Sequence, residues 1–310
     1  MIKDIQEEGK ISLLCLITKC DKGKTAKDTP YLSLILEDAS GVLDAKFWNL
    51  TEEMISKYHV GMVVEAQGDI ILHRNALQMR VRKLVEQPDE DISKYVRGAP
   101  IPREKMQEEI NGYVESIKDE ELKVIVQQVL EESENDFYTY PAATRNHHNY
   151  VGGLAYHTIS MMRMAMAVEQ LYDWLDHDLL VAGVLMHDIG KIEELSEPVL
   201  PEYTTAGNLI GHISLMASRI DRIAWDLGLQ DSESVLLLKH MVLSHHGRME
   251  FGSPVLPMIP EAEVLATIDN LDAKLFMMKA SIEVTDPGHF GPKVFALENR
   301  MIYRRKDDKK

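Results

Sequence analysis

Cysteine is scarce in this sequence, since the chain of 310 residues contains only Cys15 and Cys20. Their odd spacing would place them on opposite faces of the strand that we predict there, so no disulfide between them is expected. No pair of cysteines has the C-x-x-C spacing of a zinc site, which excludes that class of structural metal site. The low cysteine content is typical of a reducing compartment, and we predict a cytoplasmic protein.

Long apolar runs are also missing. No run approaches the roughly 20 residues that a helix needs to span a bilayer. Residues 1–8 are charged and lack the apolar core of a signal peptide, so export is not expected. With 45% hydrophobic residues, the chain is expected to be soluble and globular, without a membrane partner. Its length is sufficient for about two domains.

Basic residues are fewer than acidic residues, 34 against 50, and the formal net charge of -16 argues at first against a nucleic-acid partner. The deficit is uneven along the chain. Residues 1–88 carry 12 basic and 13 acidic residues, whereas residues 89–310 carry 22 and 37. The N-terminal part is therefore nearly neutral and can present a local basic face. Net charge does not exclude nucleic acid.

The N-terminal part shows short strand-like runs separated by turn signals. The expected strands are residues 12–19, 31–37, 42–48, 62–71 and 78–85. A helix is expected at residues 51–58, between the third and fourth strands. Three strands, a helix and two strands is the order of an OB-fold, a small barrel that often binds oligonucleotides. We therefore predict an all-β OB-fold domain over residues 1–88.

Basic and aromatic side chains of this domain are candidates for contact with a single strand. Apolar and polar residues alternate from residue 77 to 82, which places Arg80 and Arg82 on one outward face. Lysines gather near the first loop, and aromatic rings can stack on bases. The candidate nucleic-acid-binding residues are Lys22, Lys24, Tyr31, Trp48, Arg80 and Arg82. The alternative is that the lysines are only solvated and that Phe47 or Trp48 belongs to the core.

A change of composition separates a second domain. Residues 87–102 are polar and contain three prolines and a glycine, and we assign residues 89–102 as a linker. Helical periodicity is then found at residues 103–117, 120–133, 153–172, 178–189, 207–227, 232–245 and 260–281. No strand signal of comparable strength occurs there. Residues 103–310 are therefore predicted to form an all-α helical bundle.

The stretch Met186-His187-Asp188-Ile189-Gly190-Lys191 follows an apolar helical run. Burial of an imidazole beside a carboxylate is costly unless both are paired, and a divalent cation suits both ligand types. By itself the His-Asp pair is a weak motif, and a satisfied polar pair at a helix end is the commoner alternative. Other candidate ligands lie in or beside helical segments, namely His157, His212, His245, His246 and Asp269. Helical bundles hold metals by directing such side chains to a shared interior.

The order His, His-Asp, His, His-His, Asp resembles that of the HD-domain phosphohydrolase superfamily. The whole chain, with an OB-like domain in front, is similar to the YhaM family of bacterial 3′ to 5′ exoribonucleases. The segments that carry this resemblance are Thr144-Arg145-Asn146-His147-His148, Gly152-Gly153-Leu154-Ala155-Tyr156-His157-Thr158 and Ser244-His245-His246-Gly247. It implies a metal-dependent enzyme that releases nucleoside 5′-monophosphates from the 3′ end of single-stranded RNA, with single-stranded DNA as a further substrate.

The same resemblance implies the metal ligands. The core ligands would be His157, His187, Asp188 and Asp269, with Asp188 as the bridge between two cations. A second site would be completed by His212, His245 and His246. Because imidazole and carboxylate ligands are mixed, two Mn²⁺ ions are expected, with Fe²⁺ or Mg²⁺ as alternatives.

Further residues gain expected roles near this site. Lys191 would neutralise a phosphate oxygen, and its alternative is a lysine that faces solvent at a helix end. Arg145, His147 and His148 match a family motif and would bind phosphate. Asp272 lies one turn beyond Asp269 and would orient a ligand or the attacking water. The expected catalytic residues are therefore Asp188, Lys191 and Asp272.

Two other functions are compatible with these residues. One is an HD phosphodiesterase of a small nucleotide, with the barrel as a regulatory or dimerising module. No G-Y-P signature follows His245-His246-Gly247, which weakens the version that acts on cyclic dinucleotides. The other is a non-catalytic RNA-binding protein with a structural metal, which the large number of ligands disfavours. The sequence leaves open whether the protein is a homo-oligomer.

Overall fold

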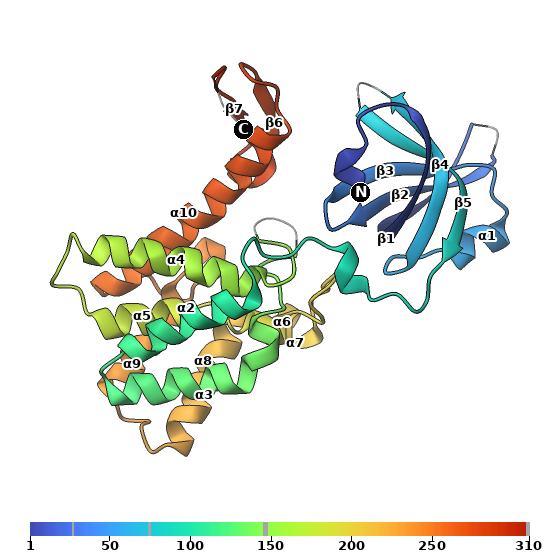
Figure 1. Cartoon of the computed structure of the whole chain (residues 1–310). Coiled ribbons are helices and arrows are strands. Elements are labelled where there is room, and N and C mark those ends of the chain that lie inside the picture. Colours follow the sequence, from blue (N-terminus) through green and yellow to red (C-terminus); the bar gives the residue numbers. More distant parts are fainter. Residues whose placement is uncertain (27, 74–75, 145–147, 308–310) are drawn as a thin grey trace. The chain divides into compact units, whose positions relative to one another are not determined.

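The structure is a computed structural model, and it describes the chain except for residues 27, 74–75, 145–147 and 308–310. The chain folds into two compact units, Met1–Gly98 and Ala99–Lys310. The division between them falls within residues 89–102. Figure 1 shows a barrel of strands in the first unit and a bundle of helices in the second.

The first unit is a closed five-stranded barrel in the order β1-β2-β3-β5-β4. Its strands are β1 (Gly9–Lys24), β2 (Pro30–Asp38), β3 (Gly41–Phe47), β4 (Val63–His73) and β5 (Ala76–Glu86). Helix α1 (Glu52–Lys57) connects β3 and β4, and the Thr51 side chain caps it by accepting a hydrogen bond from the Met54 N–H. β3 and β5 are parallel, and the other pairs are antiparallel. The predicted OB-like barrel is confirmed.

Alternation along the strands builds the barrel core. Leu32, Leu34 and Leu36 of β2 are fully buried, whereas the residues between them are partly exposed. Phe47 is also in this core, and the adjacent Trp48 lies on the outer face. The polar and aromatic residues of β2, β3 and β5 that are not part of the core therefore lie on the outer surface of the barrel.

A β-bulge changes the expected positions of the two cysteines. In the pairing of β1 with β2, Ile17 lies opposite Leu36 but Lys19 lies opposite Ile35. The extra residue reverses the alternation of the side chains. Cys15 and Cys20 therefore both pack against the barrel core, and the expectation of opposite faces is wrong. Both are free thiols, as predicted.

The second unit is a helical bundle, as predicted. Its helices are α2 (Arg103–Ser116), α3 (Glu120–Phe137), α4 (Gly153–Glu169), α5 (His177–Met186), α6 (Lys191–Glu194), α7 (Thr205–Leu209), α8 (His212–Asp226), α9 (Glu233–Ser244) and α10 (Pro260–Glu283). The helix expected at residues 207–227 is divided into α7 and α8 at Gly211, which has a φ of 78°. Among the described residues, no helix is both long and apolar enough to cross a bilayer.

Two strands near the C-terminus were not expected. β6 (Phe290–Val294) and β7 (Arg300–Tyr303) form a small antiparallel sheet that packs against α10 (Figure 1). These strands contain only five and four residues, and most of their side chains are exposed. Such short segments carry too little alternation to be recognised from sequence. The unit is thus not entirely helical.

Helix α5 lies at the centre of the bundle. Every residue from Leu179 to Met186 is buried, and the helix packs against α3, α4, α9 and α10. A helix that is apolar on all sides is stable only when it is surrounded. Its N-terminus is capped by Asp176, whose side chain accepts a hydrogen bond from the Leu179 N–H. Its C-terminus brings His187 and Asp188 into the interior.

Substitution of Phe137 tests this core. Phe137 is fully buried, so Phe137→Ala is expected to lower the free energy of unfolding of the helical unit by about 3–5 kcal/mol. Phe295 is 86% exposed, and Phe295→Ala is the matched control with an expected change within about 0.5 kcal/mol. Urea unfolding followed by circular dichroism measures both. Equal effects of the two substitutions would contradict the assigned core.

Candidate metal centre

The predicted ligands come from separate helices and meet in the interior of the second unit. His157 lies on α4, and His187 and Asp188 occupy the turn after α5. Asp269 lies on α10. His212 begins α8, and His245 and His246 follow α9 directly. Segments that are more than a hundred residues apart therefore converge on one place.

Asp188 occupies the centre of this cluster. Its Oδ2 atom is 3.2 Å from His187 Nε2 and 3.7 Å from His157 Nε2. Its Oδ1 atom is 3.5 Å from His212 Nε2 and 3.6 Å from His245 Nε2. The two oxygens of one carboxylate therefore face two different groups of imidazoles, which is the arrangement that a bridging ligand requires.

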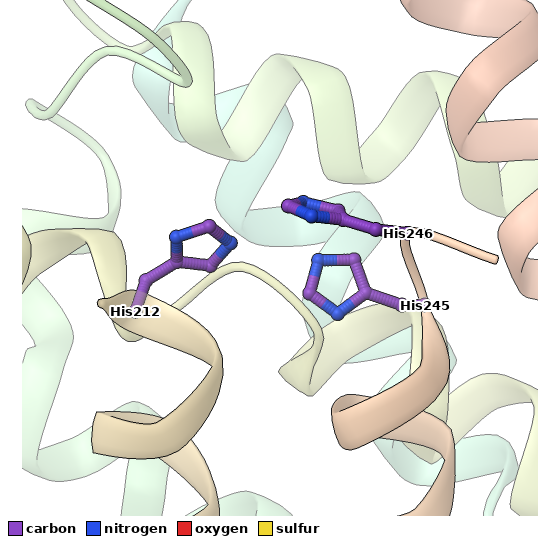
Figure 2. Close-up of side chains that lie close together, drawn as sticks. All are labelled: His212, His245 and His246. Atoms are coloured by element: carbon purple, nitrogen blue, oxygen red, sulfur yellow. The ribbon is translucent and has the colours of Figure 1, made fainter. Parts of the chain in front are cut away.

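Two groups of ligand atoms can be distinguished around Asp188. In each group the atoms lie within 4.8 Å of one another. The first group contains His157, His187 and Asp269, with His157 Nε2 3.3 Å from Asp269 Oδ1. The second contains His212, His245 and His246, whose rings lie close together in Figure 2. Each group can hold one cation.

The hydrogen bonds at Nδ1 turn the Nε2 atoms of the five histidines toward the cluster. In each ring the Nδ1 atom lies beside an oxygen that can only accept a hydrogen bond, so Nδ1 carries the proton. The acceptors are Asp272 Oδ2 for His157 (2.7 Å), Val184 O for His187 (2.8 Å), Glu194 Oε1 for His212 (3.0 Å), Val242 O for His245 (2.7 Å) and Phe251 O for His246 (2.6 Å). Metal-ligating histidines show this pattern, because the outer hydrogen bond fixes the tautomer and the ring orientation.

Three buried atoms of the cluster indicate that it is built for a cation. Asp188 Oδ1, His212 Nε2 and His245 Nε2 have no hydrogen-bond partner within the described part of the chain. Buried polar atoms without partners are rare because their desolvation is not compensated. A divalent cation would satisfy all three together. The residues fit a metal, and the mixture of nitrogen and oxygen ligands suits Mn²⁺ or Fe²⁺ better than Mg²⁺.

Lys191 is buried and forms an ion pair with Asp188, with 2.6 Å between Nζ and Oδ2. Burial lowers the pKa of Lys191, but the neighbouring Asp188 carboxylate has the larger combined effect and raises it. Burial likewise raises the pKa of Asp188, but Lys191 and His187 hold it well below the usual range. Asp188 is therefore ionised, and the alternative of a solvent-facing Lys191 is wrong.

The remaining residues predicted near the site fall into two groups. Arg145 and His147 lie outside the described residues. His148 is buried, and its Nε2 atom is 2.7 Å from Asp272 Oδ2. The same Asp272 oxygen accepts the hydrogen bond from His157 Nδ1. Asp272 therefore contacts His157, and its predicted role in orienting a ligand stays a prediction.

Glu194 and Gly190 were not predicted from the sequence. Glu194 Oε1 accepts hydrogen bonds from both the backbone N–H and the Nδ1–H of His212, and thus fixes this ring. A Cβ atom on Gly190 would lie 2.3 Å from His212 O, so glycine is required for the close approach. The spacing of Lys191 and Glu194 places them on one helical face, but it does not show which histidine Glu194 meets.

The structure brings together only some of the predicted nucleic-acid-binding residues of the barrel. The rings of Tyr31 and Trp48 are stacked, with centroids 4.4 Å apart, and Trp48 and Arg80 line one groove together with Lys46. Arg82 lines another groove and pairs with Asp69 at 2.6 Å.

The two lysine candidates point away from the stacked rings. Tyr31 covers Gly23, since a Cβ atom on Gly23 would lie 2.5 Å from the tyrosine ring. Alternation along β1 therefore directs Lys22 and Lys24, which are both exposed, to the opposite face. Lys24 also pairs with Asp28 at 3.2 Å.

Comparison with known proteins identifies the helical region. Residues 154–274 match the HD domain family. An HD domain implies a metal-dependent phosphohydrolase, and HD domains bind divalent metals. Part of the chain is also similar to two solved structures of the protein PriB from Ralstonia solanacearum. Both are 13% identical and cover 25% of this chain, with 97% and 96% of their own lengths covered and TM-scores of 0.23 and 0.22.

Removal of one imidazole tests the metal centre. His245→Ala is expected to weaken Mn²⁺ binding by more than about 100-fold, because even the outer-shell partners of metal ligands contribute about 10–100-fold. His240→Ala is the matched control on α9, the helix that His245 follows, since His240 Nε2 accepts a hydrogen bond from the Met258 N–H, outside the cluster. Isothermal titration calorimetry with MnCl₂ measures both. Unchanged Mn²⁺ affinity of His245→Ala would contradict the assigned ligand set.

Proposed function

We propose that this protein is a metal-dependent 3′ to 5′ exonuclease that acts on single-stranded RNA, and also on single-stranded DNA, and releases nucleoside 5′-monophosphates. It would thus act as the YhaM family does. The observation that carries this proposal is the Asp188-centred cluster, in which five imidazole Nε2 atoms and two carboxylates converge. An OB-like barrel in the same chain supports a polymeric nucleic acid as the substrate.

Hydrolysis of a phosphodiester requires neutralisation of its negative charge. Two bound cations, with Mn²⁺ best suited to the ligands, would screen the phosphate and make hydroxide available near neutral pH. The group of His157, His187 and Asp269 would hold one of them, and Asp188 would be shared with the second group. The folded chain keeps these ligands in place through the outer hydrogen bonds at Nδ1.

Lys191 would contact the scissile phosphate in the proposed reaction. An ammonium group has three donors, and the hydrogen bond to Asp188 uses one of them. Its charge is maintained because the Asp188 carboxylate raises its pKa despite burial. In the proposed reaction Lys191 therefore donates to a non-bridging phosphate oxygen and stabilises the charge that develops there.

The outer face of the barrel supplies a surface suited to a single strand. Trp48 and Tyr31 offer aromatic area, and Lys46 and Arg80 add positive charge in the groove beside Trp48. Stacking on aromatic rings tolerates any base, and basic side chains follow the backbone. In the proposed division of labour the barrel holds the strand and the helical unit hydrolyses it.

The direction of cleavage is the first test. RNA labelled at its 3′ end should release labelled mononucleotide at once with Mn²⁺, whereas RNA labelled at its 5′ end should shorten progressively. Asp188→Ala should abolish hydrolysis, since it removes the shared ligand of both groups. Circular RNA of the same sequence is the control and should resist. Inert linear RNA with rapid hydrolysis of small nucleotides would instead support the second candidate function, a phosphodiesterase of a small nucleotide.

The barrel surface is tested by RNA binding. Trp48→Ala should weaken binding of a single strand by about 1–3 kcal/mol, and Arg80→Ala should reduce the dependence of log K on log salt by about 0.7. Trp225→Ala, which changes a 71% exposed tryptophan of the helical unit, is the matched control. Fluorescence anisotropy over a range of salt concentrations measures these effects. If Trp48→Ala and Trp225→Ala bind RNA equally, the barrel does not hold the strand through this face.

A further inference from the structure

A chain of hydrogen bonds leads from the half-buried Tyr150 to one of the metal ligands. The Tyr150 hydroxyl is 2.7 Å from His148 Nδ1, and His148 Nε2 is 2.7 Å from Asp272 Oδ2. Asp272 Oδ2 is in turn 2.7 Å from His157 Nδ1. The opposite nitrogen of the His157 ring faces Asp269 and Asp188. His148 is therefore connected to the metal centre through Asp272 and His157.

The donors and acceptors give this chain a single direction. Asp272 Oδ2 is a carboxylate oxygen that lies 2.7 Å from both His148 Nε2 and His157 Nδ1, so it accepts a hydrogen bond from each ring. The Nε2 atom of His148 therefore carries the proton, and its Nδ1 atom accepts a hydrogen bond from the Tyr150 hydroxyl.

The backbone holds His148 in an unusual conformation. Its φ is 46°, a left-handed value that costs a non-glycine residue about 1–3 kcal/mol. The His148 carbonyl accepts a hydrogen bond from the Ala142 N–H, and a Cβ atom on Gly153 would lie only 1.9 Å from it. The ring packs against Phe276, with centroids 4.5 Å apart. Strain of this kind persists at functional sites, where surrounding contacts enforce it.

We propose that His148 is a positioning residue, which acts through Asp272 to hold the His157 ring with its Nε2 atom directed at the cation, and that Tyr150 fixes the tautomer of His148. This differs from the phosphate contact that the sequence suggested for His148, because both of its ring nitrogens are already engaged. Asp272 is likewise a positioning residue. The inference rests on the metal dependence of the proposed function, but not on its polymeric substrate.

The test measures Mn²⁺ affinity of the full chain by isothermal titration calorimetry, without RNA. Asp272→Ala is expected to weaken binding about 10–100-fold, as loss of an outer-shell partner does. His148→Ala is expected to weaken it less, by about 3–10-fold, because it acts one step further from the metal. His148→Gln should restore most of the affinity, since the amide nitrogen of glutamine can replace the Nε2 donor. The double substitution should bind Mn²⁺ no more weakly than Asp272→Ala alone.

Control variants distinguish the positioning role from a direct phosphate contact and from a further metal site. His289→Ala, an exposed histidine of the same unit, should leave Mn²⁺ affinity unchanged. Unfolding of each variant in EDTA shows whether it folds, and His148→Gln tests the role even where His148→Ala does not. Unchanged Mn²⁺ affinity in His148→Ala with a raised KM for RNA would overturn the proposal in favour of a phosphate contact. Loss of one bound Mn²⁺ per chain in Asp272→Ala would overturn it in favour of a third cation site.

The experiments can exclude the proposed function without excluding this inference, and they can exclude this inference without excluding the proposed function. If none of the proteins degrades RNA but the order of Mn²⁺ affinities is as expected, only the exonuclease is excluded. If RNA is degraded and all variants bind Mn²⁺ equally, only the positioning role is excluded.

Discussion

The burial of the Asp188 carboxylate is the constraint on which the helical unit depends. An ion removed from water loses several kcal/mol of solvation, and this must be offset by partners. Lys191 pairs with Oδ2, but the neighbours of Oδ1 are the Nε2 atoms of His212 and His245, which their outer hydrogen bonds make acceptors. Asp188 Oδ1 and these two nitrogens are all hydrogen-bond acceptors, so they repel one another unless a cation lies between them. A cation bound between them would therefore also stabilise the folded state of this unit.

The same local device positions two of the ligands. His187 and His245 each follow the last residue of a helix, and each donates from Nδ1 to the carbonyl three residues earlier, Val184 or Val242. The last carbonyls of a helix lack partners within the helix, so the imidazole satisfies one of them. The hydrogen bond simultaneously fixes the tautomer and directs Nε2 into the cluster. A helix end thus positions a predicted metal ligand.

Local patterns explain why much of the fold and most of the metal cluster could be predicted from sequence. The alternation in β2 and the continuous apolar run of α5 are local, and so is the pair His187-Asp188. Other features depend on segments that are distant in the sequence. They are the bulge between Ile17 and Lys19 and the outer hydrogen bonds of Glu194 and Asp272. A bulge depends on the partner strand, and a hydrogen bond between distant helices depends on how they pack. Sequence patterns identified which residues could bind a cation and suggested Asp272 as an orienting carboxylate, but they did not identify Glu194 or the histidine that each carboxylate contacts.

The uneven charge also has a physical consequence for the proposed function. Residues 89–310 carry an excess of 15 acidic residues, and such a surface repels a polyanion over distances of about 8–10 Å. Within that region Lys191 lies beside the ligands that would hold the cations, so in the proposed function the scissile phosphate would be attracted to this point. Residues 1–88 are nearly neutral, so in the proposed function they would bind the rest of the strand without this repulsion. In the proposed function, this distribution favours strand binding by residues 1–88 and hydrolysis by the helical unit.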